Sequence, residues 1–322
     1  MLFRIAIIIS IILFAFLILS VDTGQVVDVI AKVNPVFILI ALGTLLLEIL
    51  FKSWRLQIMT KIFAPLSFTN SLKVFLIGRP FGVVTPGQVG DLARTYSLAD
   101  KTGLKNSQSL ALSFLDKAFD LFFLLVLAAL GLVGALFLLS NGTRGILYIL
   151  IMLVILIAVL ITFIIKKNWI KFFLKPLFKL LVPHKFRAGL RASFEDFYRI
   201  FLAILKNKKA LPIIVISLII WPLVSIRVYF LAAALGISAQ FIYFLAFIPT
   251  IAFIEMLPIS IMGIGPREYA YILFFSLIKI DKEQSLSLSL LSLITNGIPV
   301  ALIGYYFVLK EEIRAKKIPL IE

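Results

Sequence analysis

The chain has 322 residues, of which 62% are hydrophobic and 15% are charged, whereas soluble domains contain about 45–50% apolar and about 25% charged residues. This composition predicts an all-α polytopic membrane protein, because a soluble core cannot bury so many apolar side chains and a bilayer needs about 20 per spanning helix. The lack of cysteine and the lone histidine exclude disulfide frameworks, zinc clusters and thiol catalysis, and the net charge of +16 favours anionic membrane lipid over nucleic acid as a partner.

The first two predicted spans lie close to the N-terminus. Residues 5–19 form an apolar run that follows Arg4 and has no small-residue cleavage pattern after it, so we expect an uncleaved span. Residues 36–51 form the second span. Lys52, Trp54 and Arg55 follow it directly, and this cluster is typical of an anchor at the membrane interface.

The hydropathy is then broken from residue 57 to residue 117. The apolar piece at 72–84 is too short and too interrupted for an ordinary span, since it carries Arg79, Pro80 and Gly82. Clear spans follow at 118–139 and 145–165, joined by a tight turn at Asn141-Gly142.

A basic connector at 166–209 separates the two halves of the single predicted domain, 1–165 and 210–322. The connector contains twelve Lys and Arg residues against two acids, which places it on the cytoplasmic side under the positive-inside rule. Aromatic and aliphatic residues recur between the cations at helical spacing, so we expect surface helices on the inner leaflet.

The second half predicts spans at 211–235, 241–257 and 286–309, with a short apolar stretch at 269–277. About eight spans with both termini in the cytoplasm of a cell-membrane protein satisfy the charge pattern. The path from 256 to 285 is open: it is either spanning, or a re-entrant hairpin followed by a crossing.

Two segments place helix breakers beside charges at membrane depth, one in each half, at residues 78–94 and 255–268. Irregular backbone at that depth is tolerated only where it is buried in protein or lines a wet cavity. The pair therefore indicates a substrate site between the halves, although two structural kinks would give the same pattern. The helix-breaking residues are Pro86, Gly87, Gly90, Pro258, Gly263, Gly265 and Pro266.

Charges inside apolar runs are the second set of candidates, because each costs roughly 2.5–3.5 kcal/mol at a helix centre unless it has a partner or a function. Arg227 is the clearest: it would bind a phosphate or pair with Glu255 or Glu48. Lys117 is expected to pair with a distant acid, and Glu48 to be a buried, hydrogen-bonded carboxyl or a proton relay. The candidate phosphate ligands are Arg79, Arg94, Arg227 and Arg267, and the supporting acids are Asp91, Asp116, Asp120, Glu255 and Glu268.

Enzyme signatures are missing from the chain. No nucleotide-binding, metalloprotease, serine-hydrolase or dinucleotide motif is present, so we expect no cofactor, no metal site and no catalytic residue of these classes. Carboxylate chemistry by Asp91, Glu255 or Glu268 stays open.

Four stretches carry a resemblance to a known family: KSWR at 52–55, TPGQVGDLAR at 85–94, LDKAFD at 115–120 and PISIMGIGPRE at 258–268. In this order they resemble the flippase-like transmembrane domain family, which includes the membrane part of lysylphosphatidylglycerol synthases, the multiple peptide resistance factor. The resemblance covers nearly the whole chain. Where that family often has Arg in its third motif, this chain has Lys117, which keeps the charge but loses bidentate phosphate geometry.

The resemblance implies translocation of lipid between leaflets. Members that aminoacylate phosphatidylglycerol carry a soluble domain after the membrane part, and this sequence ends at Glu322 without one, so we expect a stand-alone translocator rather than a lysyl transferase. The substrate would be an anionic phospholipid or a lipid-linked sugar phosphate. The alternative is a membrane-embedded transferase, with Asp116, Asp120 and Asp91 as its only plausible metal ligands, or an accessory subunit of an enzyme that makes lipids or glycolipids, acting on phosphatidylglycerol or polyprenyl-phosphate lipids.

Overall fold

A computed structural model describes residues 10, 12–17, 19, 21–139 and 190–310, and every element in these parts is a helix. The first half contributes α2 (Thr23–Ala31), α3 (Pro35–Thr60), α4 (Phe68–Val83), the 3-10 helix η1 (Pro86–Ala93), α5 (Arg94–Thr102) and α6 (Asn106–Leu139). The second half contributes α9 (Leu190–Lys206), α10 (Ala210–Ala234), α11 (Phe241–Glu255), α12 (Pro266–Ser276) and α13 (Lys282–Lys310). The predicted span at 145–165, about half of the first span (residues 5–9, 11 and 18) and most of the basic connector lie outside the described residues.

Local sequence explains where several of these helices begin and end. Asn34 caps α3 by accepting the amide of Val36 at 3.0 Å, with Pro35 in the first helical position, where a missing N–H is harmless. Ser67 caps α4 through the amide of Asn70 at 3.2 Å. Gly103 ends α5 in the left-handed conformation.

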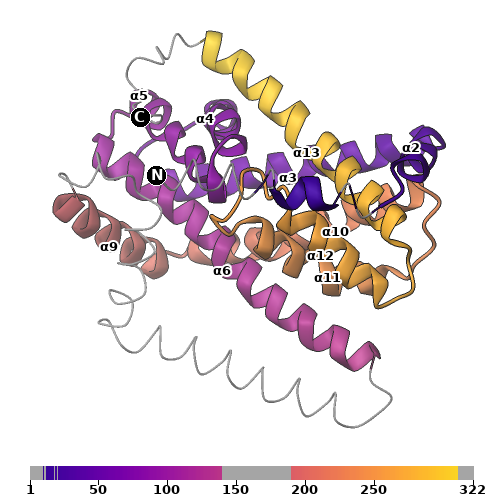
Figure 1. The fold of residues 1–322 in the computed structure, drawn as a ribbon. Helices are drawn as coiled ribbons and strands as arrows, with labels where there is room; N and C mark the ends of the chain where they lie inside the picture. Colours follow the sequence, from indigo (N-terminus) through magenta and orange to yellow (C-terminus); the bar gives the residue numbers. More distant parts are fainter. Residues whose placement is uncertain (1–9, 11, 18, 20, 140–189, 311–322) are drawn as a thin grey trace.

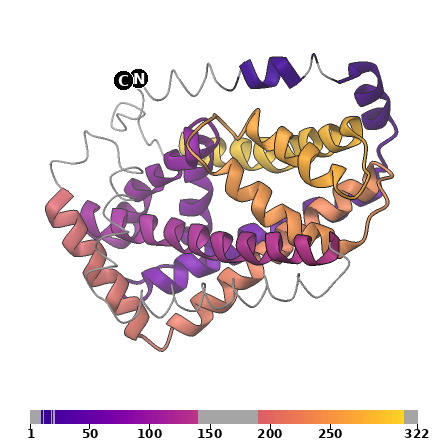
Figure 2. The same cartoon turned by 60° about the horizontal axis from the view of Figure 1, so that its bottom comes forward.

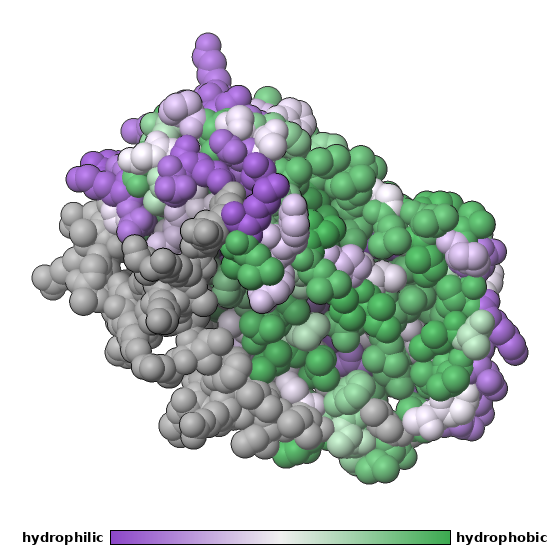
Figure 3. Space-filling model, turned by 90° about the horizontal axis from the view of Figure 1, so that it is seen from above, coloured by the Kyte–Doolittle hydropathy of each residue, from purple (hydrophilic) through white to green (hydrophobic). Residues whose placement is uncertain are grey.

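Four of the described helices are long and apolar enough to cross a bilayer: α3, the 106–134 part of α6, α10 and α13. The surface agrees, because a broad apolar area lies between one polar region at the upper left of Figure 3 and another at its right edge. The chain is therefore an all-α membrane protein, as its composition predicts.

The halves interleave in the described part of the chain. α3 packs along α10, α6 along α11, and α4 on α13, so each of these contacts joins a helix of the first half to one of the second. α6 crosses the whole molecule in Figure 1 and lies over the front of the bundle in Figure 2, while α2 and α9 occupy opposite ends. Residues distant in sequence therefore meet in the interior.

α11 and α12 are too short to span. Their 15 and 11 residues extend about 22 Å and about 16 Å at 1.5 Å per residue, less than the roughly 30 Å of a hydrocarbon core. Residues 256–265 connect them, and α13 then provides a full-length helix. This geometry favours the re-entrant hairpin followed by a crossing over two ordinary spans.

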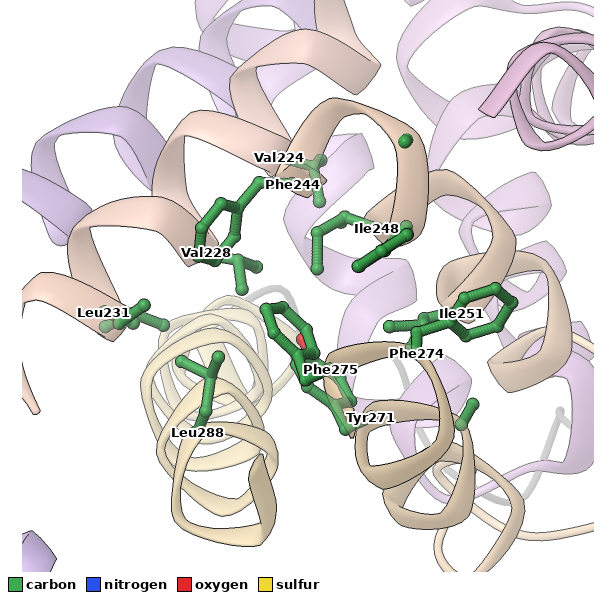
Figure 4. Packing of buried hydrophobic residues seen from close by; sticks show 14 of the residues in the cluster. Val224, Val228, Leu231, Phe244, Ile248, Ile251, Tyr271, Phe274, Phe275 and Leu288 are labelled. Atoms are coloured by element: carbon green, nitrogen blue, oxygen red, sulfur yellow. The ribbon is translucent and has the colours of Figure 1, made fainter. Parts of the chain in front are cut away.

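An aromatic core holds the short helices in place (Figure 4). Phe244 and Phe247 of α11 contact Phe275 and Phe274 of α12, with ring centroids 5.3 Å and 5.4 Å apart. Aliphatic residues of α10 and α13 complete the cluster, including Val228. Such packing fixes the hairpin position, because large rings fill the interior without polar groups to satisfy.

Candidate functional site

The first broken segment begins later than the sequence suggests. α4 continues through Arg79, Pro80 and Gly82 to Val83, whereas we expected these residues to interrupt it. Pro80 cannot donate to the carbonyl of Leu76, and Gly304 of α13 packs against that carbonyl so closely that a β-carbon there would lie 2.2 Å from its oxygen. α13 thus covers the proline site without a break in α4.

The chain reverses at Gly87 and Gln88, which have φ values of 62° and 53°. Thr85 stabilises the turn: its hydroxyl donates to the carbonyl of Phe81 at 2.9 Å and accepts the amide of Gly90 at 2.7 Å. η1 then folds back over α4. Pro86 provides the start of η1, and Gln88 is held in a conformation that L-residues seldom adopt.

This reversal places Asp91 in the interior. Its carboxylate lies directly over Gly82, where an added β-carbon would be 1.9 Å from Oδ1, so only glycine leaves room for it. Lys117 of α6 binds Asp91 Oδ2 at 3.2 Å, and Arg79 of α4 binds the same oxygen at 3.3 Å. Lys117 also donates to Gln88 Oε1 at 3.1 Å. The expected distant acid for Lys117 is therefore Asp91.

A second group of charges joins α3, α5 and α6. Arg55 is fully buried; its Nε donates to Asp116 Oδ1 at 2.8 Å and its Nη2 lies 2.7 Å from Asp120 Oδ1. Arg94 binds the other oxygen of Asp116 at 2.7 Å. Ser217 of α10 accepts a further bond from Arg55 at 3.0 Å. One turn separates Asp116 from Asp120, which lets a single guanidinium bind both.

This network corrects the interpretation of residues 52–55 as an interface anchor. α3 continues through them to Thr60, Arg55 is buried, and Lys52 binds Glu48 at 2.9 Å. Trp54 alone of the three predicted anchor residues is exposed, at 46%. The charges need no contact with water because acids of the same protein satisfy them.

Arg227 lies in the middle of α10 and pairs with Glu48 of α3. Of the two acids proposed as its partner, the structure selects Glu48 and leaves Glu255 aside. Lys52 binds the other oxygen of Glu48 at 2.9 Å, so this carboxylate lies between two cations.

Two adjacent charged residues of the second broken segment pair with each other. Arg267 pairs with its neighbour Glu268, and Glu268 Oε2 accepts the amide of Gly265 at 2.6 Å. Arg267 Nε donates to Ser289 of α13 at 3.1 Å. Met262, Gly263 and Gly265 have positive φ, and Pro266 starts α12.

The two broken segments meet. A β-carbon on Gly87 would lie 3.2 Å from the carbonyl oxygen of Met256 and 3.4 Å from Cβ of Pro258. Beside this contact lies a polar cavity of about 70 Å³, and a smaller one of about 30 Å³ shares several of its residues. The larger is lined by Arg79, Arg94, Arg227, Asp91, Asp116, Asp120 and Glu255, and the smaller by Arg79, Arg267 and Glu255. Of the predicted site residues outside the helix breakers, Glu268 lines neither.

Three buried N–H donors at the larger cavity have no hydrogen-bond partner among the described residues: Nε of Arg94, Nε of Arg227 and Nε1 of Trp221. Buried donors are nearly always satisfied, so a group of three in one place calls for a ligand or water. The site has what an anion needs, namely cations and free donors.

Sequence reasoning missed several lining residues, among them Lys52, Gln88, Trp221, Tyr271, Ser292 and Asn296. Lys52 had a signal that we did not use, since Glu48, Lys52 and Arg55 are spaced by four and three residues and so share one face of a helix. The polar residues of α13 gave no comparable signal, because serine and asparagine are common in membrane helices for packing reasons. Within the described ranges, no three His, Asp or Glu side chains are grouped as ligands for a metal ion.

Known proteins match the chain over most of its length. A curated relative, a UPF0104 membrane protein of Methanothermobacter thermautotrophicus, is 24% identical over 289 residues, which cover 84% of each chain. The family described as the lysylphosphatidylglycerol synthase TM region matches residues 1–304, which include both broken segments and the residues that line the cavities. The chain therefore belongs to the lysylphosphatidylglycerol synthase transmembrane-region family.

Proposed function

We propose that this protein moves an anionic lipid headgroup, of a phospholipid or a lipid-linked sugar phosphate, between the two leaflets of the cell membrane. The observation that carries the proposal is the group of three unpaired donors on Arg94, Arg227 and Trp221 at a cavity between the broken segments. Phosphate oxygens accept hydrogen bonds from donors of this kind, and no residue that the structure describes accepts from these three.

The acids in this proposal orient the cations. Asp116 fixes Arg94 and Glu48 fixes Arg227, each through one end of the guanidinium. Each Nε stays available for a headgroup. Arg79 and Arg267 extend the positive path toward the smaller cavity.

The size of the cavity adds a requirement. Its volume of about 70 Å³ suits only a few water molecules, since each needs about 10–15 Å³. A headgroup would therefore pass only when the broken segments separate at Gly87 and Pro258. Both termini and the basic connector would face the cytoplasm, where the connector's cations meet anionic lipid.

The test is leaflet exchange of fluorescent phosphatidylglycerol and of a polyprenyl-phosphate sugar in liposomes that contain the purified protein. Trp221→Phe removes one unpaired donor, the indole N–H, and keeps an aromatic ring at the position. Losing one bond to a charged group costs at least about 1.5 kcal/mol, so exchange should fall about tenfold. Trp54→Phe is the matched control on the lipid-exposed surface and should leave exchange unchanged.

Arg227→Ala is the stronger variant. It removes a cation from the cavity, and exchange should be lost while the helical circular-dichroism signal is kept. Equal exchange by wild type, Trp221→Phe and Arg227→Ala would refute the site. No exchange of either lipid by folded wild-type protein would instead favour the transferase or accessory-subunit alternative.

A further inference from the structure

Five carboxylates line the two cavities, and a sixth, Glu268, pairs with Arg267, which lines the smaller one. All of the six except Glu255 are held by cations. Glu48 pairs with Lys52 and Arg227, Asp91 with Lys117 and Arg79, Asp116 with Arg55 and Arg94, Asp120 with Arg55, and Glu268 with Arg267. Glu255 forms neither an ion pair nor a hydrogen bond with any residue that the structure describes. Its charge is therefore the one that can change without breaking an ion pair.

The position of Glu255 links the cavities to the second broken segment. Glu255 is the last residue of α11 and lines both cavities, so water in either can reach its carboxyl group. Its side chain packs against Gly263, where an added β-carbon would lie 2.5 Å from Cγ of Glu255. A change at Glu255 acts directly on a turn whose backbone has positive φ.

The groups that face Glu255 come from several helices. Arg79 of α4, Arg227 of α10 and Arg267 of α12 are the cations, and Glu268 of α12 is the acid. Tyr271 of α12 also faces it. The neutral neighbours in the cavities are Gln88 of η1 and Ser292 and Asn296 of α13.

An anionic headgroup competes with the Glu255 carboxylate for Arg227 at the larger cavity, and for Arg79 and Arg267 along the path to the smaller one. When the headgroup is bound, protonation of Glu255 removes a like charge beside it. When the site is empty, the arginines stabilise the ionised carboxylate against the burial that disfavours it. By linkage, the headgroup and the proton each raise the affinity for the other by the same factor, and couplings of this kind amount to about 5- to 150-fold.

We propose that Glu255 carries a proton together with the anionic headgroup, so that the protein is a proton–anionic lipid symporter. This inference rests on the proposed lipid translocation. One O–H bond forms on the Glu255 carboxyl when the headgroup binds, and the same bond breaks when the headgroup leaves on the other side. No electrons are transferred, and the proton gradient supplies the driving force.

The experiment compares wild type, Glu255→Gln and Glu283→Gln in proteoliposomes, with phosphatidylglycerol as the probe and a pH difference across the membrane. Wild type should transfer the lipid several-fold faster from the acidic to the alkaline side than in the reverse direction. Glu255→Gln should lose this asymmetry, and Glu255→Asp, which keeps a carboxyl group, should retain it. Glu283 pairs with Lys282 at the start of α13, away from the cavity lining, so Glu283→Gln should behave as wild type.

A second measurement separates this inference from the proposed function. Short-chain phosphatidylglycerol is added to unbuffered, detergent-solubilised protein, and proton uptake is followed with a pH indicator. Uptake by wild type that is lost in Glu255→Gln supports coupling at Glu255 even if no lipid crosses the membrane. Two results would overturn the inference: wild-type lipid transfer at equal rates in both directions under the pH difference, or proton uptake that persists in Glu255→Gln. Neither result would contradict lipid translocation itself.

Discussion

The two broken segments hold their charges in opposite ways. In the first, Asp91 and Arg94 bind residues of other helices, Lys117 and Asp116 of α6. In the second, Arg267 binds the adjacent Glu268, and the pair is completed by Ser289. Buried ion pairs therefore hold the first segment to other helices of the bundle. In the second segment, two adjacent charged residues pair with each other.

From this difference we infer that the first segment is a fixed framework and that the second segment is the part that moves. Breaking a buried ion pair costs about 3–5 kcal/mol, because one charge is left uncompensated, so the first segment can move only at high cost. The second segment can shift without separating its own charges. Motion that admits a headgroup should therefore be concentrated at residues 256–265, which directly follow the unpaired Glu255.

The largest expected effect comes from joining the two segments. In the double variant Gly87→Cys and Pro258→Cys, the β-carbons would lie about 3.4 Å apart, close to the 3.5–4.5 Å of natural disulfides. Since the chain has no cysteine, no other disulfide can form. Closing a loop of this length stabilises by up to about 5 kcal/mol in the chain-entropy model.

Thermal unfolding of the oxidised and reduced forms measures this stabilisation. Leaflet exchange measures how far the cross-link slows lipid transfer. We expect exchange to stop on oxidation and to return on reduction. Each single-cysteine variant controls for the substitution itself. Full exchange by the cross-linked protein would show that the headgroup does not pass between these segments.

The second largest effect is expected from the loss of Arg55. This residue binds Asp116, which pairs with Arg94 of the first segment, and it also binds Asp120 and Ser217. Among the described residues, Arg55→Ala leaves Asp120 with only the distant ion pair to Lys52, at 3.8 Å, so the unfolding free energy should fall by about 3–5 kcal/mol. Denaturation in detergent measures the loss, and an unchanged unfolding free energy would contradict a framework role for these ion pairs.

The all-α membrane class and the positions of several long helices could be predicted from the sequence, because long apolar runs are typical of spans that face lipid. The runs at 211–235 and 286–309 match α10 and α13 to within four residues at each end. The run at 36–51 ended too early, since Lys52 and Arg55 were assumed to leave the membrane. Charges end a span only when no internal partner exists, and a partner such as Asp116 lies 61 residues away in the sequence.

Most of the predicted site residues line the two cavities, but how their charges pair was not predictable from the sequence. Helix breakers beside charges marked both segments, and the arginines they pointed to do line the cavities. The partner of Arg227 depended on how α3 packs along α10, which no local pattern encodes. Pro80 shows the same limit, because α4 continues past it where Gly304 of a distant helix packs closely against it, and no local pattern predicts that contact.

A smaller effect is expected at the turn of the first segment. A β-carbon on Gly90 would lie 2.0 Å from the carbonyl oxygen of Phe81, a backbone atom that cannot move aside cheaply. Gly90→Ala should therefore cost about 1–3 kcal/mol of stability and displace Asp91. Gly43, in α3, has open space around its β-position, so Gly43→Ala should leave the unfolding temperature unchanged or slightly higher. Equal unfolding temperatures for the two alanine variants would contradict the tight turn.

The smallest effect is expected at Ser289, which connects the second segment's ion pair to α13. Its hydroxyl accepts from Arg267 Nε at 3.1 Å and donates to Glu268 Oε1 at 3.2 Å. Ser289→Ala removes both bonds but leaves Arg267 paired with Glu268, so stability should fall by about 1 kcal/mol. Ser276→Ala, at the exposed end of α12, is the matched control. If the second segment is the moving part, Ser289→Ala should speed leaflet exchange while it lowers the unfolding temperature, because a looser hairpin opens more often. A fall in both quantities would instead show that the hairpin must stay rigid for transfer.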